Sequence, residues 1–237
     1  MRYLIVNADD FGQSRGINQG ITQCYENGVV TSASLMVRWP AAAEACAFAK
    51  VNTELSVGLH VDLGEWRNTD GDWRPVYEVV PLDDEAAVRE EVKRQVEWFK
   101  RLLGRGPSHL DSHQHVHLRE PVRSVLRDMA EKLNVPLRHE TAEIRYSGDF
   151  YGQSSDGSPV PEPISLDGLL NILGRLDAPI TELACHPGRP DGLDTMYRSE
   201  REAEVQTLTD PRVGEALERL SIRLCSFTSV PHDLQTS

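Results

Sequence analysis

Short apolar runs recur along the chain, and most are followed by a segment whose apolar residues repeat at the helical spacing. We expect buried strands at 3–6, 32–37, 55–63, 109–115, 136–140, 180–186 and 222–228. Helical patterns occupy 17–27, an Ala-rich stretch opened by Pro40, 83–103, 120–133, 166–176 and a polar stretch before the last strand. This strand-then-helix alternation predicts parallel strands with crossover helices, in one barrel or one doubly wound sheet.

Two longer segments, 64–81 and 145–163, carry neither pattern, and we expect them to be irregular loops. No internal repeat or low-complexity linker divides the chain, whose 237 residues suit one large domain or two small ones. We therefore predict a single α/β domain over residues 1–237.

The charge balance narrows the class of partner. With 37 acidic and 25 basic residues, the formal net charge is −12, which argues against binding to a nucleic-acid backbone. No run of about 18 apolar residues is present, so we expect no membrane span, and the first residues lack the apolar length of a signal peptide. The four cysteines are scattered without paired spacing, which favours a reducing, cytoplasmic location.

Polar residues gather where four of the predicted strands end, in segments 7–12, 58–60, 111–117 and 185–188. Active sites of parallel α/β folds form at the carboxyl ends of the strands. We therefore expect the four segments to converge at one end of the sheet.

The first two segments supply carboxylates and one histidine. Asp9 and Asp10 could divide roles around a divalent cation, one as a ligand and the other as general base on the attacking water. One of them could instead cap the following helix. His60 stands in an otherwise apolar strand, where a histidine on its own is more often a core residue than a ligand.

The third segment places His113, His115 and His117 at alternate positions. On an extended strand such residues share a face about 6.5–7 Å apart, whereas zinc–nitrogen bonds measure about 2.0–2.1 Å. One or two of these histidines could therefore bind one ion, and the others would line the pocket or lie on the surface without a role.

The fourth segment ends in Pro187 and Gly188, which would stop the strand and expose His186 at its rim. An imidazole titrates near neutrality and could act as general acid toward a leaving amine. Cys185 should face away from His186 on the strand, so we expect it to be a core thiol.

Taken together, segments 7–12, 58–60, 109–117 and 186–188 resemble the YdjC-like carbohydrate deacetylases, a family that includes chitooligosaccharide and hopanoid-associated deacetylases. The resemblance runs from Tyr3 to Thr228. It implies a TIM-barrel-like (β/α) barrel of about seven parallel strands, and hydrolysis of an N-acetyl group on an amino sugar.

The resemblance also implies roles for individual residues. Asp10, His60 and His113 would hold one divalent metal ion, zinc or magnesium, with positions left open for water and substrate. Asp9 would be the general base and His186 the acid that protonates the leaving amine. Arg138, at the end of its strand, would hold Asp9 ionised.

The partner that this implies is a small carbohydrate. Trp66 and Tyr151, together with Tyr146, could stack on sugar rings or simply anchor long loops, and His115 and Arg138 are further candidates for substrate contacts. The sequence is compatible with a homodimer. Two rival functions remain, a phosphoesterase-like metal hydrolase and a non-catalytic sugar-binding relative. Few basic residues lie near the motifs to hold a phosphate, which disfavours the first.

Overall fold

A parallel sheet forms the centre of the molecule. The computed structural model describes residues 1–69, 71–192 and 194–231. Its main sheet has the order β6-β3-β2-β1-β8-β7, and β9 also pairs with β1. Every pairing in this sheet is parallel. The strands are β1 Arg2–Phe11, β2 Ser32–Leu35, β3 Ser56–Val61, β6 Leu110–Ser112, β7 Arg145–Ser147, β8 Ile180–Cys185 and β9 Ile222–Leu224.

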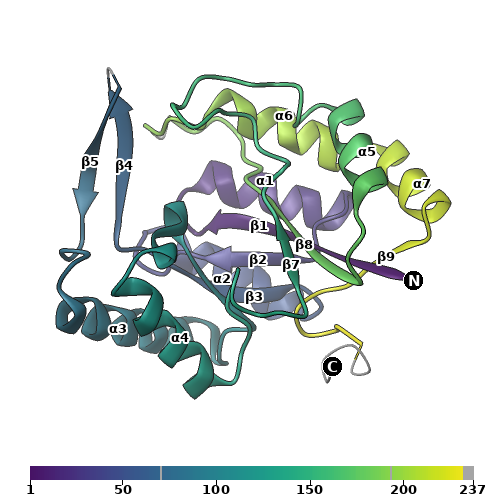
Figure 1. Cartoon of the computed structure of the whole chain (residues 1–237). Helices are drawn as coiled ribbons and strands as arrows, with labels where there is room; N and C mark the ends of the chain where they lie inside the picture. The colour runs from purple at the N-terminus through teal and green to yellow at the C-terminus, as the bar shows by residue number, and fades with distance from the viewer. Residues whose placement is uncertain (70, 193, 232–237) are drawn as a thin grey trace.

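Helices surround the sheet on both sides, with α1 and α6 on one side and α3 and α4 on the other (Figure 1). Side-chain caps explain several of their beginnings, since Ser14, Asp84 and Ser165 each accept a backbone N–H of the first turn. The helices are α1 Arg15–Asn27, α2 Ala42–Val51, α3 Glu85–Leu103, α4 Val122–Leu133, α5 Leu166–Arg175, α6 Ser199–Leu208 and α7 Pro211–Arg219.

Strand β1 is buried on both faces, which explains its continuous apolar run. Leu4, Val6 and Ala8 belong to the main core, whereas Ile5 packs in a smaller cluster with Phe227. The predicted α/β class with about seven parallel strands is confirmed, and the sheet is curled into a half-barrel with helices around it. Cys185 is fully buried in the main core, as expected.

The structure corrects four local predictions. Segment 136–140 is not a strand and pairs only through an isolated bridge between Leu137 and Leu110. The strand predicted at 109–115 ends at Ser112, and a 3₁₀ helix η1, His113–Leu118, follows it. Segment 64–81 is not irregular but contains an antiparallel hairpin, β4 Gly64–Thr69 and β5 Asp72–Glu78.

The loop predicted over 145–163 likewise begins with strand β7, which pairs with β8. Within the described ranges, no helix has both the length and the apolar character needed to cross a bilayer.

A close glycine contact holds α1 against the segment that follows β8. A Cβ built on Gly20 would lie 2.4 Å from the Cα of Gly188, which is backbone and cannot move aside like a side-chain tip. Gly188 follows His186 by two residues, so this contact helps to fix the end of β8.

We predict that Gly20→Ala lowers the free energy of unfolding by about 1–3 kcal/mol, because the added methyl group overpacks this contact. Gly174→Ala is the matched control. Gly174 is exposed in α5 with no atom within 4 Å of its virtual Cβ, so this change should stabilise the protein by about 0.5–1 kcal/mol. Urea unfolding measures both values, and equal stability of Gly20→Ala and the wild-type chain would contradict the packing argument.

Candidate active site

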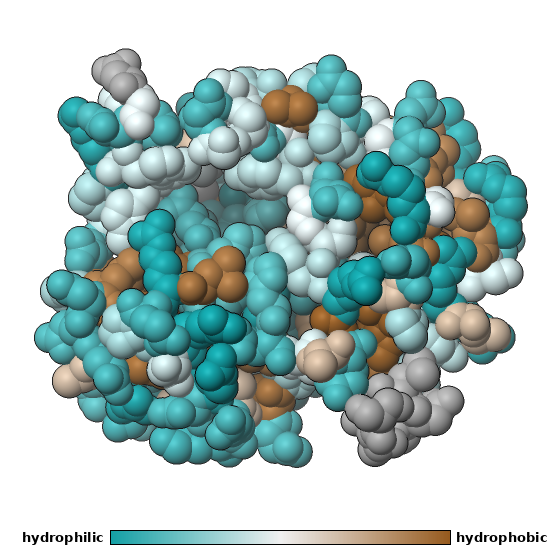
Figure 2. Space-filling model, in the orientation of Figure 1, coloured by the Kyte–Doolittle hydropathy of each residue, from teal (hydrophilic) through white to brown (hydrophobic). Residues whose placement is uncertain are grey.

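A cavity of about 710 Å³ opens at the carboxyl ends of the strands. Figure 2 shows a hollow on this face beside the β4–β5 hairpin, surrounded mostly by hydrophilic and intermediate residues. The expected convergence of the four polar segments is therefore found in the structure. The cavity lining includes Asp9, Asp10, His60, Glu65, Trp66, His113, His115, Tyr151, His186 and Arg201.

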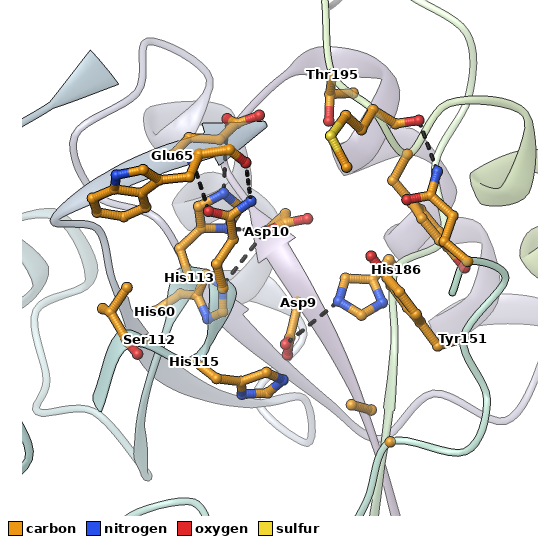
Figure 3. Close-up of a pocket in the computed structure, with 18 of the residues that line it drawn as sticks. Asp9, Asp10, His60, Glu65, Ser112, His113, His115, Tyr151, His186 and Thr195 are labelled. Atoms are coloured by element: carbon orange, nitrogen blue, oxygen red, sulfur yellow. Dashed lines mark hydrogen bonds and ion pairs between the residues drawn. The ribbon is translucent and has the colours of Figure 1, made fainter. Parts of the chain in front are cut away.

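An irregularity in β1 brings two consecutive carboxylates into one site. Successive side chains of a regular strand point to opposite faces. Between Ala8 and Phe11, however, the register of β1 against β2 shifts, and Asp10 adopts a φ of 67° in the left-handed region. Bulges of this kind redirect side chains, and Asp tolerates this backbone region better than most residues. Asp9 and Asp10 therefore both line the cavity (Figure 3).

Asp10, His60 and His113 form a compact group with ligand atoms within 4.8 Å of one another. Asp10 Oδ1 lies 3.4 Å from His60 Nε2 and 3.1 Å from His113 Nδ1. His60 Nδ1 lies 2.8 Å from Asp111 Oδ1, and a proton on that nitrogen leaves the Nε2 lone pair facing Asp10. Carboxylates hold metal-binding histidines in this way. One carboxylate and two imidazoles suit a zinc-type ion with open positions.

The charges around Asp10 favour its ionised form. Burial alone would raise the pKa of Asp10, but the Arg201 guanidinium and the hydrogen bonds from His113 and His60 hold it well below its usual range. Arg201 Nη2 lies 2.7 Å from Asp10 Oδ2, which leaves Oδ1 directed toward the two histidines. Burial alone would lower the pKa of His113, yet Asp10 and Glu65 raise it to about 9. The group thus concentrates negative charge. A bound cation could neutralise this charge in place of the protons on the histidines.

A second arrangement, Asp9 with His60 and Asp111, has similar spacing. Both of its carboxylates are already paired with Arg138, whose Nη1 lies 2.7 Å from Asp9 Oδ2 and whose Nη2 lies 2.9 Å from Asp111 Oδ2. A divalent ion there would share its ligands with a fully buried guanidinium. The group built on Asp10 is therefore the better metal site.

Asp9 and His186 face each other across the base of the cavity (Figure 3). His186 Nε2 lies 3.8 Å from Asp9 Oδ2, and its Nδ1 is buried without a partner. Burial lowers the pKa of His186 to about 4, so the resting imidazole is neutral. The backbone N–H of His186 donates to Glu204, which also accepts from the Tyr197 hydroxyl, and these contacts fix the start of the segment after β8.

Three of the four predicted substrate residues line the cavity, whereas the fourth, Arg138, is buried. Trp66, Tyr151 and His115 all line the cavity. Trp66 is held by Gln114, whose side chain exchanges two 2.8 Å hydrogen bonds with the Trp66 backbone. Arg138 is 3 % exposed and directs its donors at carboxylates, including both oxygens of Asp9.

Sequence reasoning missed four residues that shape the site. Arg201 lies in α6 and Glu65 in β4, and neither lies in one of the four polar segments at the strand ends, so position along the chain gave no signal. Tyr197 stacks on Tyr151 with ring centroids 4.7 Å apart. Asp111 could have been given a role, because it lies within segment 111–117, two residues before His113.

Comparisons with known proteins identify the family of this chain. The family model described as YdjC-like protein matches residues 3–219. The chain is 33% identical to a carbohydrate deacetylase of Geobacillus stearothermophilus, over 95% of this chain and 97% of the relative. It is 31% identical to a chitooligosaccharide deacetylase of Serratia marcescens, over 95% and 98%.

Among solved structures, an Enterococcus faecalis V583 protein assigned provisionally to cellobiose-phosphate cleavage superposes with a TM-score of 0.76 and 26% identity, over 96% of this chain and 98% of that one. The family match extends over nearly the whole chain, and the relatives are matched over nearly their full length. The chain belongs to the YdjC-like protein family.

Proposed function

We propose that this protein is a metal-dependent hydrolase that removes the N-acetyl group from an amino sugar or an N-acetylated oligosaccharide. The observation that carries the proposal is the pair of adjacent carboxylates, with Asp10 turned toward His60 and His113 and Asp9 turned toward His186. The names of the relatives from Geobacillus and Serratia support the same reaction class.

The metal-binding group (Asp10, His60 and His113) and the acid–base pair (Asp9 and His186) would perform separate parts of the reaction. A divalent ion held by Asp10, His60 and His113 would polarise the acetyl carbonyl and make the attacking water more acidic. Arg201 keeps Asp10 charged through its 2.7 Å contact with Oδ2. Zinc and magnesium are the candidate ions, and two imidazoles favour zinc.

Asp9 and His186 form the path for the transferred proton. Asp9 accepts a proton from the attacking water, which forms the new bond to the acetyl carbon. Arg138 holds the pKa of Asp9 low against the opposing effect of burial, so the protonated carboxyl readily gives up this proton. The neutral His186 accepts it and delivers it to the sugar nitrogen as the carbon–nitrogen bond breaks. Acetate and a free amine are the products.

The cavity suits a small carbohydrate. Its volume of about 710 Å³ lies within the range of small-molecule sites, roughly 300–1,000 Å³. Trp66 and Tyr151, which line the cavity, would contact the apolar faces of sugar rings, and His115 is a further candidate for a substrate contact. The guanidinium of Arg201 is occupied by Asp10 and by two backbone carbonyls, which disfavours its use as a phosphate anchor.

We predict that the purified protein, reloaded with zinc or magnesium, releases acetate from N-acetylated chitooligosaccharides and that removal of the metal with a chelator abolishes this activity. Acetate is measured enzymatically, with 4-nitrophenyl phosphate as the parallel substrate. Hydrolysis of the phosphate ester alone would favour a phosphoesterase. Sugar binding without release of acetate would indicate a non-catalytic relative.

We predict that Asp9→Asn retains metal but loses turnover by roughly 10²–10⁴-fold, because it removes the general base and leaves the ligands in place. Asp10→Asn should weaken metal binding, and added metal should partly restore its rate. Asp177→Asn, an exposed change beyond α5, should match the wild-type chain in both. Bound metal and turnover are measured across a metal titration. If Asp9→Asn lost metal and Asp10→Asn retained it, Asp9 would be the metal ligand and Asp10 the general base.

We predict that His186→Ala keeps metal and loses roughly 10²–10⁴-fold in turnover on N-acetyl substrates. Its defect on 4-nitrophenyl acetate should be much smaller, because the phenolate leaves without being protonated. The ratio of the two defects is the measurement. Normal turnover on the amide would rule out His186 as the acid and make His115 the next residue to replace.

A further inference from the structure

Three histidines gather beside the proposed catalytic group without belonging to it. One ring nitrogen of each of His115, His117 and His139 lies within 4.8 Å of one nitrogen of each of the others. The ring centroids are 5.8 Å apart for His115 and His117, 5.4 Å for His115 and His139, and 5.5 Å for His117 and His139. Small side-chain movements would bring all three nitrogens to about 2.0–2.1 Å from one ion.

Two of these rings have an unsatisfied buried nitrogen and a hydroxyl at the other nitrogen. His117 is 0% exposed; its Nδ1 lies 2.6 Å from Ser112 Oγ, while its Nε2 has no partner. His115 Nε2 lies 3.2 Å from the Tyr146 hydroxyl, while its Nδ1 has no partner. Buried polar atoms are rarely left unpaired, so a group that satisfies both nitrogens is expected here.

The hydroxyl contacts prepare the rings as ligands. Ser112 Oγ already accepts the backbone N–H of His117 at 3.0 Å, and it can accept Nδ1–H of the same residue as well. In that tautomer the lone pair of His117 is on the unpaired Nε2. A hydrogen bond from His115 Nε2–H to the oxygen of Tyr146 has the same effect on His115. Metal-bound histidines almost always donate their other N–H in this manner.

The surrounding charge is compatible with a cation despite the nearby Arg138. That guanidinium lies 5.1 Å from the ring centroid of Tyr146, which packs on His139. Arg138 is paired with the carboxylates of Asp9, Asp111 and Glu182, so its positive charge is offset locally. His139 is exposed and gives solvent access to the cluster.

We propose that His115, His117 and His139 form a second metal site, which takes a borderline transition-metal ion such as Zn²⁺. Three imidazoles favour such ions over Mg²⁺ or Ca²⁺, which prefer oxygen ligands. The proposal is independent of the proposed function, since it uses none of Asp10, His60 and His113. His115, which lines the cavity, would be one ligand of this second ion.

The test counts tightly bound zinc in untagged, metal-stripped protein by titration against a chromophoric chelator. We expect two equivalents for the wild-type chain and one fewer for His139→Gln, an exposed change that circular dichroism should show to be folded. His186→Gln, a cavity histidine outside both groups, is the matched control and should retain the wild-type count.

The difference between the two variants decides the proposal. A zinc count for His139→Gln equal to that of the wild-type chain would overturn it, and so would an equal loss in His186→Gln. If the wild-type chain bound one equivalent of zinc and His139→Gln bound none, the second site would be upheld and the proposed catalytic ion would be contradicted. The two claims can therefore fail separately.

Discussion

The site depends on one buried guanidinium. Arg138 contacts Asp9, Asp111 and Glu182 with nitrogen–oxygen distances of 2.6–2.9 Å. Burying an unpaired carboxylate costs several kcal/mol, and removing one partner of a buried ion pair costs about 3–5 kcal/mol. Without Arg138, three acids from β1, β6 and β8 could not lie buried together. The cationic residue therefore allows the carboxylates to remain buried and, for Asp9 and Asp111, ionised.

This arrangement separates the two members of the Asp pair. Asp9 faces Arg138 below the cavity, whereas Asp10 is turned by its left-handed backbone toward His60 and His113. Asp111 links the two halves, because it accepts from His60 and pairs with Arg138. The same chemical group thus receives different surroundings at consecutive positions. That difference, rather than residue type, underlies the proposed division between metal ligand and base.

Apolar periodicity was sufficient to predict the parallel sheet and the edge at which its polar segments meet. It could not predict the path of the chain beyond the strand ends. After β6 the chain turns through two left-handed residues, Gln114 and His115, so the extended spacing assumed for 113–117 does not apply. Sequence periodicity carries no signal for such a turn. Periodicity also gave no signal for Arg201, which lies 191 residues after Asp10 in the chain and contacts it from a helix.

The position of the catalytic ion would show which member of the Asp pair is the metal ligand. Crystals grown with zinc would give an anomalous difference peak at the zinc absorption edge. We predict a peak about 2.0–2.2 Å from Asp10 Oδ1 and from one ring nitrogen each of His60 and His113. A peak between Asp9 and Asp111, with none beside Asp10, would show that Asp10 is not the metal ligand.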